Sequence, residues 1–319
     1  MPLPWMLGAM IANTVAALSH VPLVAPVSLR LVMVPILGVM LGSAFHPGIF
    51  DRLGEWSVAF AALPVFTCLA FALSFFVYRV IGRFDGVTAY FSAAPGGLTD
   101  MMLIGGAAGG SERRIGLAHS GRILVVVTFV AIFYATFFDI RAVGDARPYV
   151  GLIDVAPVDL LVLGLCAIAG VWIGPKVRLP APQLVGPMVV SAIVHFAGVT
   201  DAPPPSLLVN AAQVVIGTVV GCRFAGAKLK EVAHDLWLSL LSSIGMLAAA
   251  LATAFAVAAA LGVGVDRIFL AFSPGGLPEM SLLALSMGAD VAFVATLHIA
   301  RIVLVISLAP LFFRWWRGS

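Results

Sequence analysis

Long apolar runs separated by short polar connections extend along the whole chain. A helix that spans a bilayer needs about 20 predominantly apolar residues, and several of the runs are shorter than that. This pattern predicts an all-α polytopic membrane protein. The runs are Trp5–Ala17, Leu31–Ala44, Trp56–Tyr78, Val87–Ala107, Gly116–Phe138, Leu160–Gly174, Leu184–Gly198, Leu207–Gly221, Leu236–Leu261, Ile268–Met287 and Ala292–Phe313.

The composition indicates that lipid, not water, surrounds most of the surface. Of the 319 residues, 61% are hydrophobic and only 10% are charged, and the mean hydropathy is +1.10. A soluble domain carries about 25% charged residues, so an apolar core alone cannot explain this chain. No stretch is polar enough to form a separate soluble domain, and we therefore expect one membrane domain.

Several classes of chemistry have no residues to carry them. The net charge of +3 comes from basic residues in short clusters between apolar runs, which offer no surface for tracking a nucleic acid. Cys68, Cys166 and Cys222 lie singly, which favours buried apolar thiols over metal ligands. Phosphate-binding loops, nucleophile elbows and metal-ligand clusters are also missing from the sequence. We expect no enzyme activity, no cofactor and no nucleic-acid partner.

An internal duplication is the strongest signal in the sequence. The sequence Ala-Pro-Gly-Gly-Leu at 94–98 recurs as Ser-Pro-Gly-Gly-Leu at 273–277, and 274 − 95 gives an offset of 179. This predicts two repeats, 1–150 and 151–319, within the one membrane domain. The same offset relates Gly38 to Gly217, Gly42 to Gly221, Phe45 to Phe224, Asp100 to Glu279, Met101 to Met280, Gly109 to Gly288, His119 to His298 and Arg122 to Arg301.

One run lacks a counterpart in this duplication. Leu160–Gly174 opens the second repeat, and its equivalent would fall before Met1. We therefore expect that the first helix of the first repeat is missing from this chain. The similarity of Pro2-Leu3-Pro4 to Leu179-Pro180-Ala181, which follows the Leu160–Gly174 run, points the same way.

The two Pro-Gly-Gly sequences predict interruptions of their helices. Proline removes a backbone hydrogen bond, and glycine favours unwinding. Free backbone groups in lipid are costly, so such a break persists only inside protein or beside a water-filled cavity. Each run is either a discontinuous spanning helix or a re-entrant hairpin.

The loop charges favour the re-entrant geometry. If every run spans the membrane, the 16 basic residues outside the runs divide 8 and 8 between the two sides; if the two Pro-Gly-Gly runs return to their own side, they divide 12 and 4. Cytoplasmic loops carry an excess of Lys and Arg, so the richer side is cytoplasmic. It holds Arg30, Arg79, Arg83, Arg113, Arg114, Lys176, Arg178, Arg223, Lys228, Lys230, Arg314 and Arg317, and the poorer side holds Arg52, Arg141, Arg147 and Arg267.

An odd number of crossings in each repeat follows from this topology. The visible first repeat would cross four times and the second five times, so a full repeat has about five crossings. Two such repeats lie in opposite orientations, and inverted repeats with broken segments are the scaffold of many secondary transporters. The two breaks would enter from opposite faces and approach each other.

Polar residues near the breaks are the candidate functional groups. Asp100 and Glu279 bind a cation, accept a proton, or cap the helix that resumes after the break. His119 and Arg122, like His298 and Arg301, share a helix face. The candidate substrate or ion-binding residues are Pro95, Gly96, Gly97, Asp100, His119, Arg122, Pro274, Gly275, Gly276, Glu279, His298 and Arg301.

Two roles for these arginines remain open. An arginine at membrane depth normally faces a partner or a cavity. Arg122 and Arg301 either pair structurally, with the acids or with carbonyls freed at the breaks, or form an anion site with proton-sensitive histidines. The patterns Gly38-x-x-x-Gly42 and Gly217-x-x-x-Gly221 predict close helix packing.

These motifs resemble the AbrB duplication family of bacterial membrane proteins over essentially the whole chain. The resemblance rests on the duplicated Pro-Gly-Gly-Leu with its following acid, on His-x-x-Arg, and on Leu7-Gly8-Ala9-Met10 and Leu184-Val185-Gly186-Pro187-Met188, which are similar to that family's L-L-G-P-M signature. Members are often labelled putative ammonia monooxygenase, which would need copper ligands that this chain lacks, or transcriptional regulator. The family is also grouped with antiporter-like transporters.

The resemblance and the repeats together imply a function. We expect a multi-pass protein of the bacterial inner membrane that carries a small solute, coupled to protons or cations. The alternative is a membrane sensor or regulatory protein that affects gene expression indirectly. The sequence leaves the solute, the coupling ion and the oligomeric state open, a homo-oligomer included.

Overall fold

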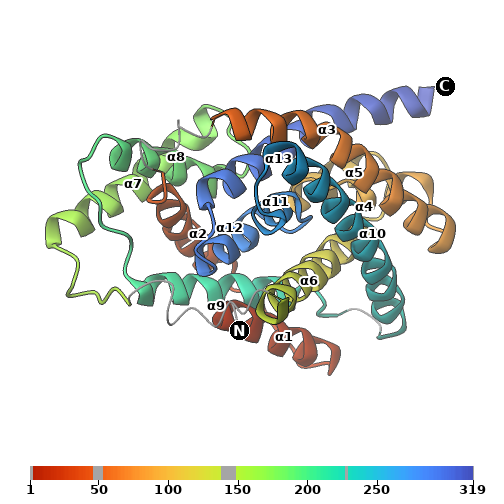
Figure 1. Ribbon diagram of the computed structural model, residues 1–319. Coiled ribbons are helices and arrows are strands. Elements are labelled where there is room, and N and C mark those ends of the chain that lie inside the picture. Colours follow the sequence, from red (N-terminus) through yellow and green to blue (C-terminus); the bar gives the residue numbers. More distant parts are fainter. Residues whose placement is uncertain (1–2, 46–52, 138–148, 227–228, 319) are drawn as a thin grey trace. The chain divides into compact units, whose positions relative to one another are not determined.

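Helices make up all of the regular structure in the residues that the structure describes. The computed structural model describes residues 3–45, 53–137, 149–226 and 229–318, and Figure 1 labels its helices. The expected all-α class is confirmed for these residues. The elements are α1 (Pro4–Leu18), α2 (Val27–Gly42), α3 (Leu53–Phe76), the π-helical turn η2 (Val77–Ile81), α4 (Gly86–Ala93), α5 (Leu98–Ala107), α6 (Glu112–Phe137), α7 (Pro157–Lys176), α8 (Pro182–Phe196), α9 (Ser206–Cys222), α10 (Leu229–Leu261), α11 (Val265–Phe272), α12 (Leu277–Ser286) and α13 (Val291–Gly318).

Helix boundaries recur at the spacing of the sequence duplication. Helix α4 begins at Gly86 and α11 at Val265, and 265 − 86 is 179. The starts of α2 and α9, of α5 and α12, and of α6 and α13 are separated by the same 179 residues. The starts of α1 and α8 differ by 178 and those of α3 and α10 by 176, and among the described α-helices α7 is left without a counterpart. The two halves therefore carry the same order of helices around the extra α7.

Five described helical segments are long and apolar enough to cross a membrane. They are Trp56–Ile81, Glu112–Phe137, Pro157–Lys176, Glu231–Leu261 and Val291–Trp316. Helices α1, α2, α8 and α9 have 15 to 17 residues, which at 1.5 Å per residue gives roughly 22–26 Å, less than a bilayer core of about 30 Å. Length and composition thus support a membrane protein, while the nine crossings stay a prediction.

The described chain folds as two compact units that each draw on both repeats. Unit 1 comprises Met1–Leu53, Ala131–Ala225 and Ser281–Ala295, and unit 2 comprises Gly54–Val130, Gly226–Met280 and Thr296–Ser319. The predicted repeats 1–150 and 151–319 are therefore interleaved in space. The loop charges Arg52, Arg141, Arg147 and Lys228, which entered the topology argument, lie outside the described residues.

Glycines bring the helices of unit 1 into backbone contact. A Cβ atom added to Gly38 of α2 would meet the carbonyl of Leu184 in α8, and one added to Gly217 of α9 would meet the carbonyl of Met6 in α1. Gly42 and Gly221 make equivalent close approaches one turn further along. The close packing predicted from the two Gly-x-x-x-Gly patterns is confirmed.

These contacts are reciprocal between the two halves of the chain. Helix α2 of the first half packs on α8 of the second, and α9 of the second half packs on α1 of the first. Polar links follow the same rule: Asn13 Nδ2 donates to Thr218 Oγ1 (3.3 Å), and Ser191 Oγ donates to the Val39 carbonyl (2.8 Å). Since 191 − 13 is 178 and 218 − 39 is 179, the two bonds join nearly equivalent positions of the two halves in exchanged roles.

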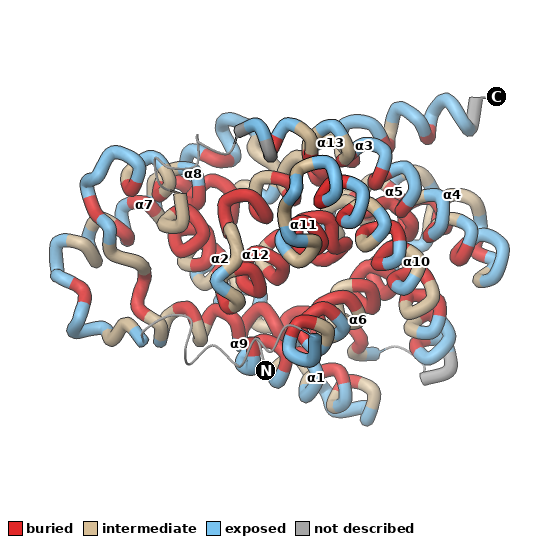
Figure 2. Tube along the Cα trace, viewed as in Figure 1, coloured by how far each residue is buried: buried red, intermediate tan, exposed pale blue. Residues whose placement is uncertain are grey.

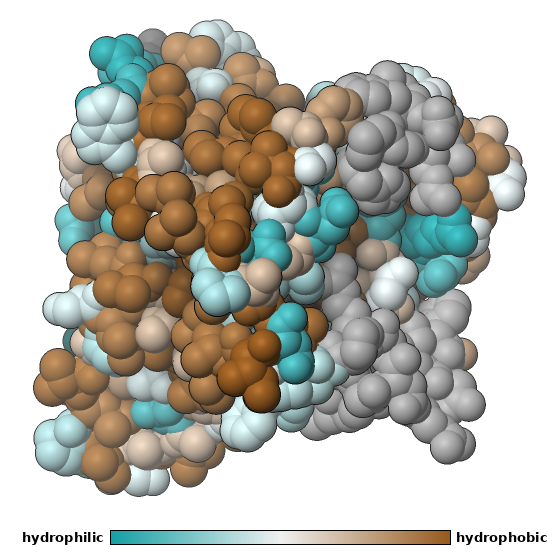
Figure 3. All heavy atoms as spheres, turned by 90° about the vertical axis from the view of Figure 1, so that its left-hand side faces the viewer, coloured by the Kyte–Doolittle hydropathy of each residue, from teal (hydrophilic) through white to brown (hydrophobic). Residues whose placement is uncertain are grey.

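Helix α7 breaks this symmetry within unit 1. Its Gly170 and Gly174 lie against Gly186 and its neighbours in α8, so closely that a Cβ on Gly186 would collide with the Gly170 carbonyl. The equivalent glycine of α1, Gly8, has nothing within 4 Å of such a Cβ. Figure 3 looks onto the side where α7 lies, and hydrophobic residues cover much of that face. The large exposed apolar side chains of α7 are Val158, Leu161, Leu165, Ile168, Trp172 and Ile173.

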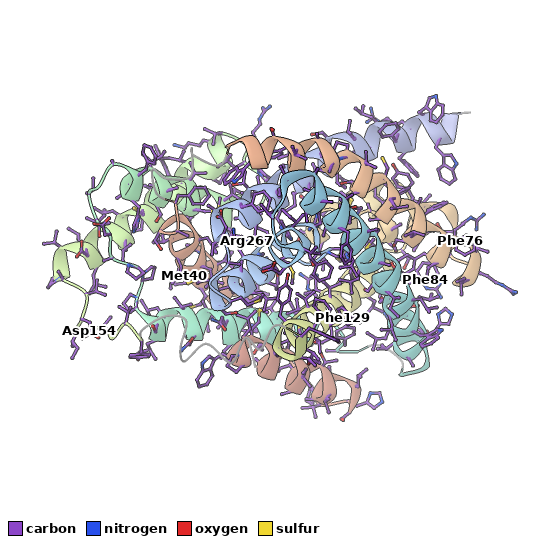
Figure 4. The ribbon with its side chains drawn as sticks, viewed as in Figure 1. Met40, Phe76, Phe84, Phe129, Asp154 and Arg267 are labelled. Carbon is purple, nitrogen blue, oxygen red and sulfur yellow. The ribbon has the colours of Figure 1, made fainter. Side chains whose placement is uncertain are left out.

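Unit 2 contains α6 as far as Val130, and this part of the helix carries one His-x-x-Arg pair. In α6, 67% of the most apolar stretch is buried, against 22% in α7, and the buried stretches of α6 are red in Figure 2. Phe84, labelled in Figure 4, packs against Tyr78 (ring centroids 5.5 Å apart) and lies 4.7 Å from the Arg114 guanidinium. A separate apolar cluster joins Ile115 of α6 to Tyr90, Phe91, Met101 and Val305.

Gly186→Ala and Gly8→Ala form a matched test of this packing. We expect Gly186→Ala to destabilise the protein by about 1–3 kcal/mol, because the added methyl group forces α7 and α8 apart. Gly8→Ala should leave stability unchanged or raise it, since its surroundings are open and alanine favours helix. Thermal unfolding of the two purified variants in detergent measures both effects. Equal unfolding temperatures for the pair would contradict the described contact between α7 and α8.

Candidate functional site

Two interruptions, each centred on a Pro-Gly-Gly sequence, lie in unit 2. Helix α4 ends at Ala93 and α5 begins at Leu98, while α11 ends at Phe272 and α12 begins at Leu277. A residue before proline is forced towards extended backbone, and Ala94 (ψ 124°) and Ser273 (ψ 132°) both have it. The last carbonyls of α4 and α11 consequently lack partners within their helices.

Arg122 of α6 supplies a hydrogen bond at the first interruption. Its Nη1 donates to the Ala94 carbonyl over 3.2 Å, and its Nη2 lies 2.7 Å from Nδ1 of His119. Both side chains are buried, with Arg122 only 5% exposed. A guanidinium has no acceptor, so Nδ1 of His119 must accept. The proton of the imidazole then sits on Nε2, which donates to the Phe91 carbonyl over 2.9 Å.

Arg301 of α13 supplies the same support at the second interruption. Its Nη1 donates to the Ser273 carbonyl (3.0 Å) and its Nη2 to the Gly275 carbonyl (2.9 Å). Nε2 of His298 lies 3.2 Å from the Ser273 carbonyl. Arg301 is 3% exposed, so these bonds form away from water.

The two arginines occupy equivalent places and meet equivalent atoms. Ala94 and Ser273 are 179 positions apart, as are Arg122 and Arg301, and each arginine donates to the carbonyl that precedes its proline. Of the partners considered for these arginines, the structure thus places them on the freed carbonyls. Their hydrogen bonds to protein within the described residues go to carbonyls and to His119.

The two acids lie at the other side of each interruption. Asp100 and Glu279 fall in the first turns of α5 and α12, where the helix dipole favours a negative charge. Their carboxylates fold back over the glycines that precede those helices: a Cβ on Gly97 would lie 2.5 Å from Asp100 Oδ2, and one on Gly276 would collide with Glu279 Oε2. Glu279 is buried, whereas Asp100 is partly exposed.

Helix α13, which carries Arg301, also lies against the first interruption, because a Cβ on Gly96 would come 2.8 Å from Val305 Cγ1. Unit 2 holds two buried positive charges, each attached to the end of a short helix. Among the described residues, no group of three or more His, Cys, Asp or Glu side chains is arranged to hold a metal ion.

A second set of buried polar groups in unit 2 did not emerge from the sequence. Ser242 Oγ and Ser74 Oγ are 2.6 Å apart, Tyr78 donates to Ser239 Oγ (3.4 Å), and Ser239 donates to the Asp235 carbonyl (2.8 Å). Asp235 is only 3% exposed. The available signal was the spacing 235, 239, 242, which places three polar residues on one face of the apolar α10.

Comparison with known proteins identifies relatives over nearly the whole chain. The family described as "Transition state regulatory protein AbrB" matches residues 5–317. A Bacillus subtilis protein named "Uncharacterized protein YhjN" is 29% identical over 292 residues, covering 88% of this chain and 76% of that protein. The Escherichia coli protein named "Putative regulator AbrB" is 25% identical over 311 residues, covering 97% and 89%. No solved structure matches the chain.

Arg301→Lys tests whether the hydrogen bonds of Arg301 stabilise the second interruption. Lysine is a point charge and cannot bridge the Ser273 and Gly275 carbonyls as the planar guanidinium does. We expect a loss of about 1.5–3 kcal/mol and faster amide hydrogen exchange over 274–280, measured by mass spectrometry. Arg267→Lys, at an exposed position of α11, is the control. If both variants exchange like the parent protein, Arg301 does not hold this segment.

Proposed function

From the geometry above we propose that this chain, which belongs to the AbrB family, is a secondary transporter of a small solute, coupled to protons or cations. The observation that carries the proposal is the pair of interruptions in unit 2, each attached to a buried arginine. Membrane proteins keep irregular backbone only where it is enclosed or lines a cavity. Secondary transporters build their substrate sites from such broken segments.

The proposal includes an inverted relation between the two repeats. Reciprocal packing of α2 on α8 and of α9 on α1 supports a two-fold relation between the halves. The 12-to-4 division of loop charges supports an axis in the membrane plane, with α4–α5 and α11–α12 as re-entrant hairpins. The two hairpins then enter from opposite sides, and the chain crosses nine times in a bacterial inner membrane.

Asp100 and Glu279 are the proposed coupling acids. Each lies beside an interruption, where gain or loss of a proton or cation alters how strongly the carboxylate holds the helix start. Glu279 is the stronger candidate of the two, because it is buried while Asp100 is partly exposed. The neutral His119, with its Nδ1 turned to Arg122, would lose that contact on protonation.

Glu279→Gln tests coupling in reconstituted vesicles. Trapped pyranine reports internal pH while sodium or potassium salts of succinate, phosphate and chloride are added outside. We expect at least one salt to drive a pH change in vesicles that contain the parent protein, and we expect Glu279→Gln to abolish it because glutamine cannot exchange a proton. Glu231→Gln is the control, since Glu231 is exposed and its ion pair with Arg113 (3.4 Å) is of the weak surface kind.

Normal solute-driven pH changes in the Glu279→Gln vesicles would remove the coupling role. Flux that responds to sodium but not to pH would instead assign the coupling to a metal cation. Radiolabelled solute uptake, measured in parallel, keeps transport and coupling apart.

A membrane sensor is the second candidate function. The Escherichia coli relative is named a putative regulator, and the family description is that of a regulatory protein. A sensor would bind its ligand through the same interruptions and change shape without flux. Ligand binding to the purified protein, combined with no uptake into vesicles at any gradient, would favour the sensor over the transporter.

A further inference from the structure

Arg122 and Arg301 retain buried hydrogen-bond donors after all their contacts with protein are counted. Each guanidinium carries five N–H groups, and the bonds to carbonyls and to His119 use Nη1 and Nη2 only. Nε of both arginines is shielded from solvent and has no hydrogen-bond partner within the part of the chain that the structure describes. Native proteins rarely leave such a group unsatisfied, and here it occurs at both equivalent positions.

The hydrogen-bond partners of Arg122 and Arg301 also leave much of their positive charge uncompensated. The partners of the arginines are carbonyls and an imidazole nitrogen that accepts, all of them neutral. The carboxyl end of a helix offers at most about −0.5 of a charge, and α4 and α11 have only eight residues each. Asp100 and Glu279 lie in the first turns of α5 and α12, where the helix dipole favours a negative charge. The hydrogen bonds of the two guanidinium groups to neutral acceptors leave much of their charge in place.

Burial makes this arrangement costly without an additional partner. An ion that leaves water loses several kcal/mol of solvation unless an opposite charge compensates it. An anion that accepts a hydrogen bond from each Nε would satisfy both donors and compensate both charges.

We propose that Arg122 and Arg301 together bind the carboxylate of a small organic anion, with one N–H donated from each Nε. A carboxylate matches the planar guanidinium and has two oxygens to share between two donors. Apolar groups border the interruptions, since Val305 and Met101 flank Gly96 and Met280 flanks Gly275. They suit the carbon skeleton of an organic ion better than a fully hydrated inorganic one.

This inference deepens the proposed function and rests on it, because the bound anion would be the transported solute. Both Nε atoms are closed off from solvent in this structure. Entry of the anion therefore requires the surrounding helices to move apart, which is the change that alternating access needs.

Calorimetric titration of the purified protein in nanodiscs tests the site. The probes are sodium succinate and sodium benzoate, with sodium phosphate and tetramethylammonium chloride for comparison, all at constant ionic strength. We expect saturable binding of a carboxylate and a loss of affinity of about tenfold or more in Arg122→Gln and in Arg301→Gln. Arg267→Gln, on the exposed side of α11, should bind like the parent.

A chemical measurement covers the case in which the arginine variants fail to fold. Phenylglyoxal modifies arginine, and mass spectrometry locates the modified positions in the parent protein. We expect succinate or benzoate to slow modification of Arg122 and Arg301 and to leave Arg267 unaffected. Equal modification with and without the carboxylates would overturn the proposal.

The outcomes separate this inference from the transport function. Uptake of a cation or neutral solute, with no carboxylate binding, would overturn the anion site and leave transport standing. Carboxylate binding that depends on both arginines, without uptake into vesicles, would support the site and remove the transporter. Binding of phosphate alone would overturn the assignment of the ligand to the carboxylates.

Discussion

The bond from a buried guanidinium to a helix-ending carbonyl is the interaction on which unit 2 depends. Proline and glycine open the backbone at two places, and the carbonyls freed there cannot reach water. Arg122 and Arg301 supply the missing donors. An arginine in an apolar interior is itself unfavourable, so the two costs offset each other only because they occur at the same place. Removing either partner leaves the other exposed to its full desolvation cost.

The duplication makes each type of contact occur twice, and the type that is repeated differs between the two units. In unit 1, paired glycines bring α2 against α8 and α9 against α1 with hardly any side chain between the backbones. In unit 2, the repeated feature is a polar one, with donors and carbonyls matched inside an apolar environment. Backbone-to-backbone packing resists deformation, since neither surface has a flexible group that can yield. A few hydrogen bonds at a helix break can exchange partners at lower cost, as the proposed transport function would require.

Local sequence patterns predicted where helices are interrupted, but they did not predict how distant helices pack together. The Pro-Gly-Gly sequences fixed where α4 and α11 end, because proline and glycine act on their own backbone. The i, i+3 spacing placed His119 beside Arg122. The sequence analysis named freed carbonyls as possible acceptors, but it did not identify those of Ala94 and Ser273. Every residue has a backbone carbonyl, so the residue type does not reveal which carbonyl accepts. The serines of α10 were missed, and the interleaving of the repeats in two units was not predicted, since contacts between distant segments do not appear in a hydropathy pattern.

The two interruptions are held by different sets of hydrogen bonds. Arg301 uses both Nη atoms on carbonyls of its own interruption, whereas Arg122 divides them between Ala94 and His119. The first interruption is thus linked to a histidine, and its acid Asp100 is partly exposed. The second is held by two carbonyl bonds and has the buried acid Glu279. In the proposed transporter, a site with one half held by two carbonyl bonds and the other shared with a histidine would yield more easily on one side than on the other. Exact symmetry would instead make both halves equally free to open.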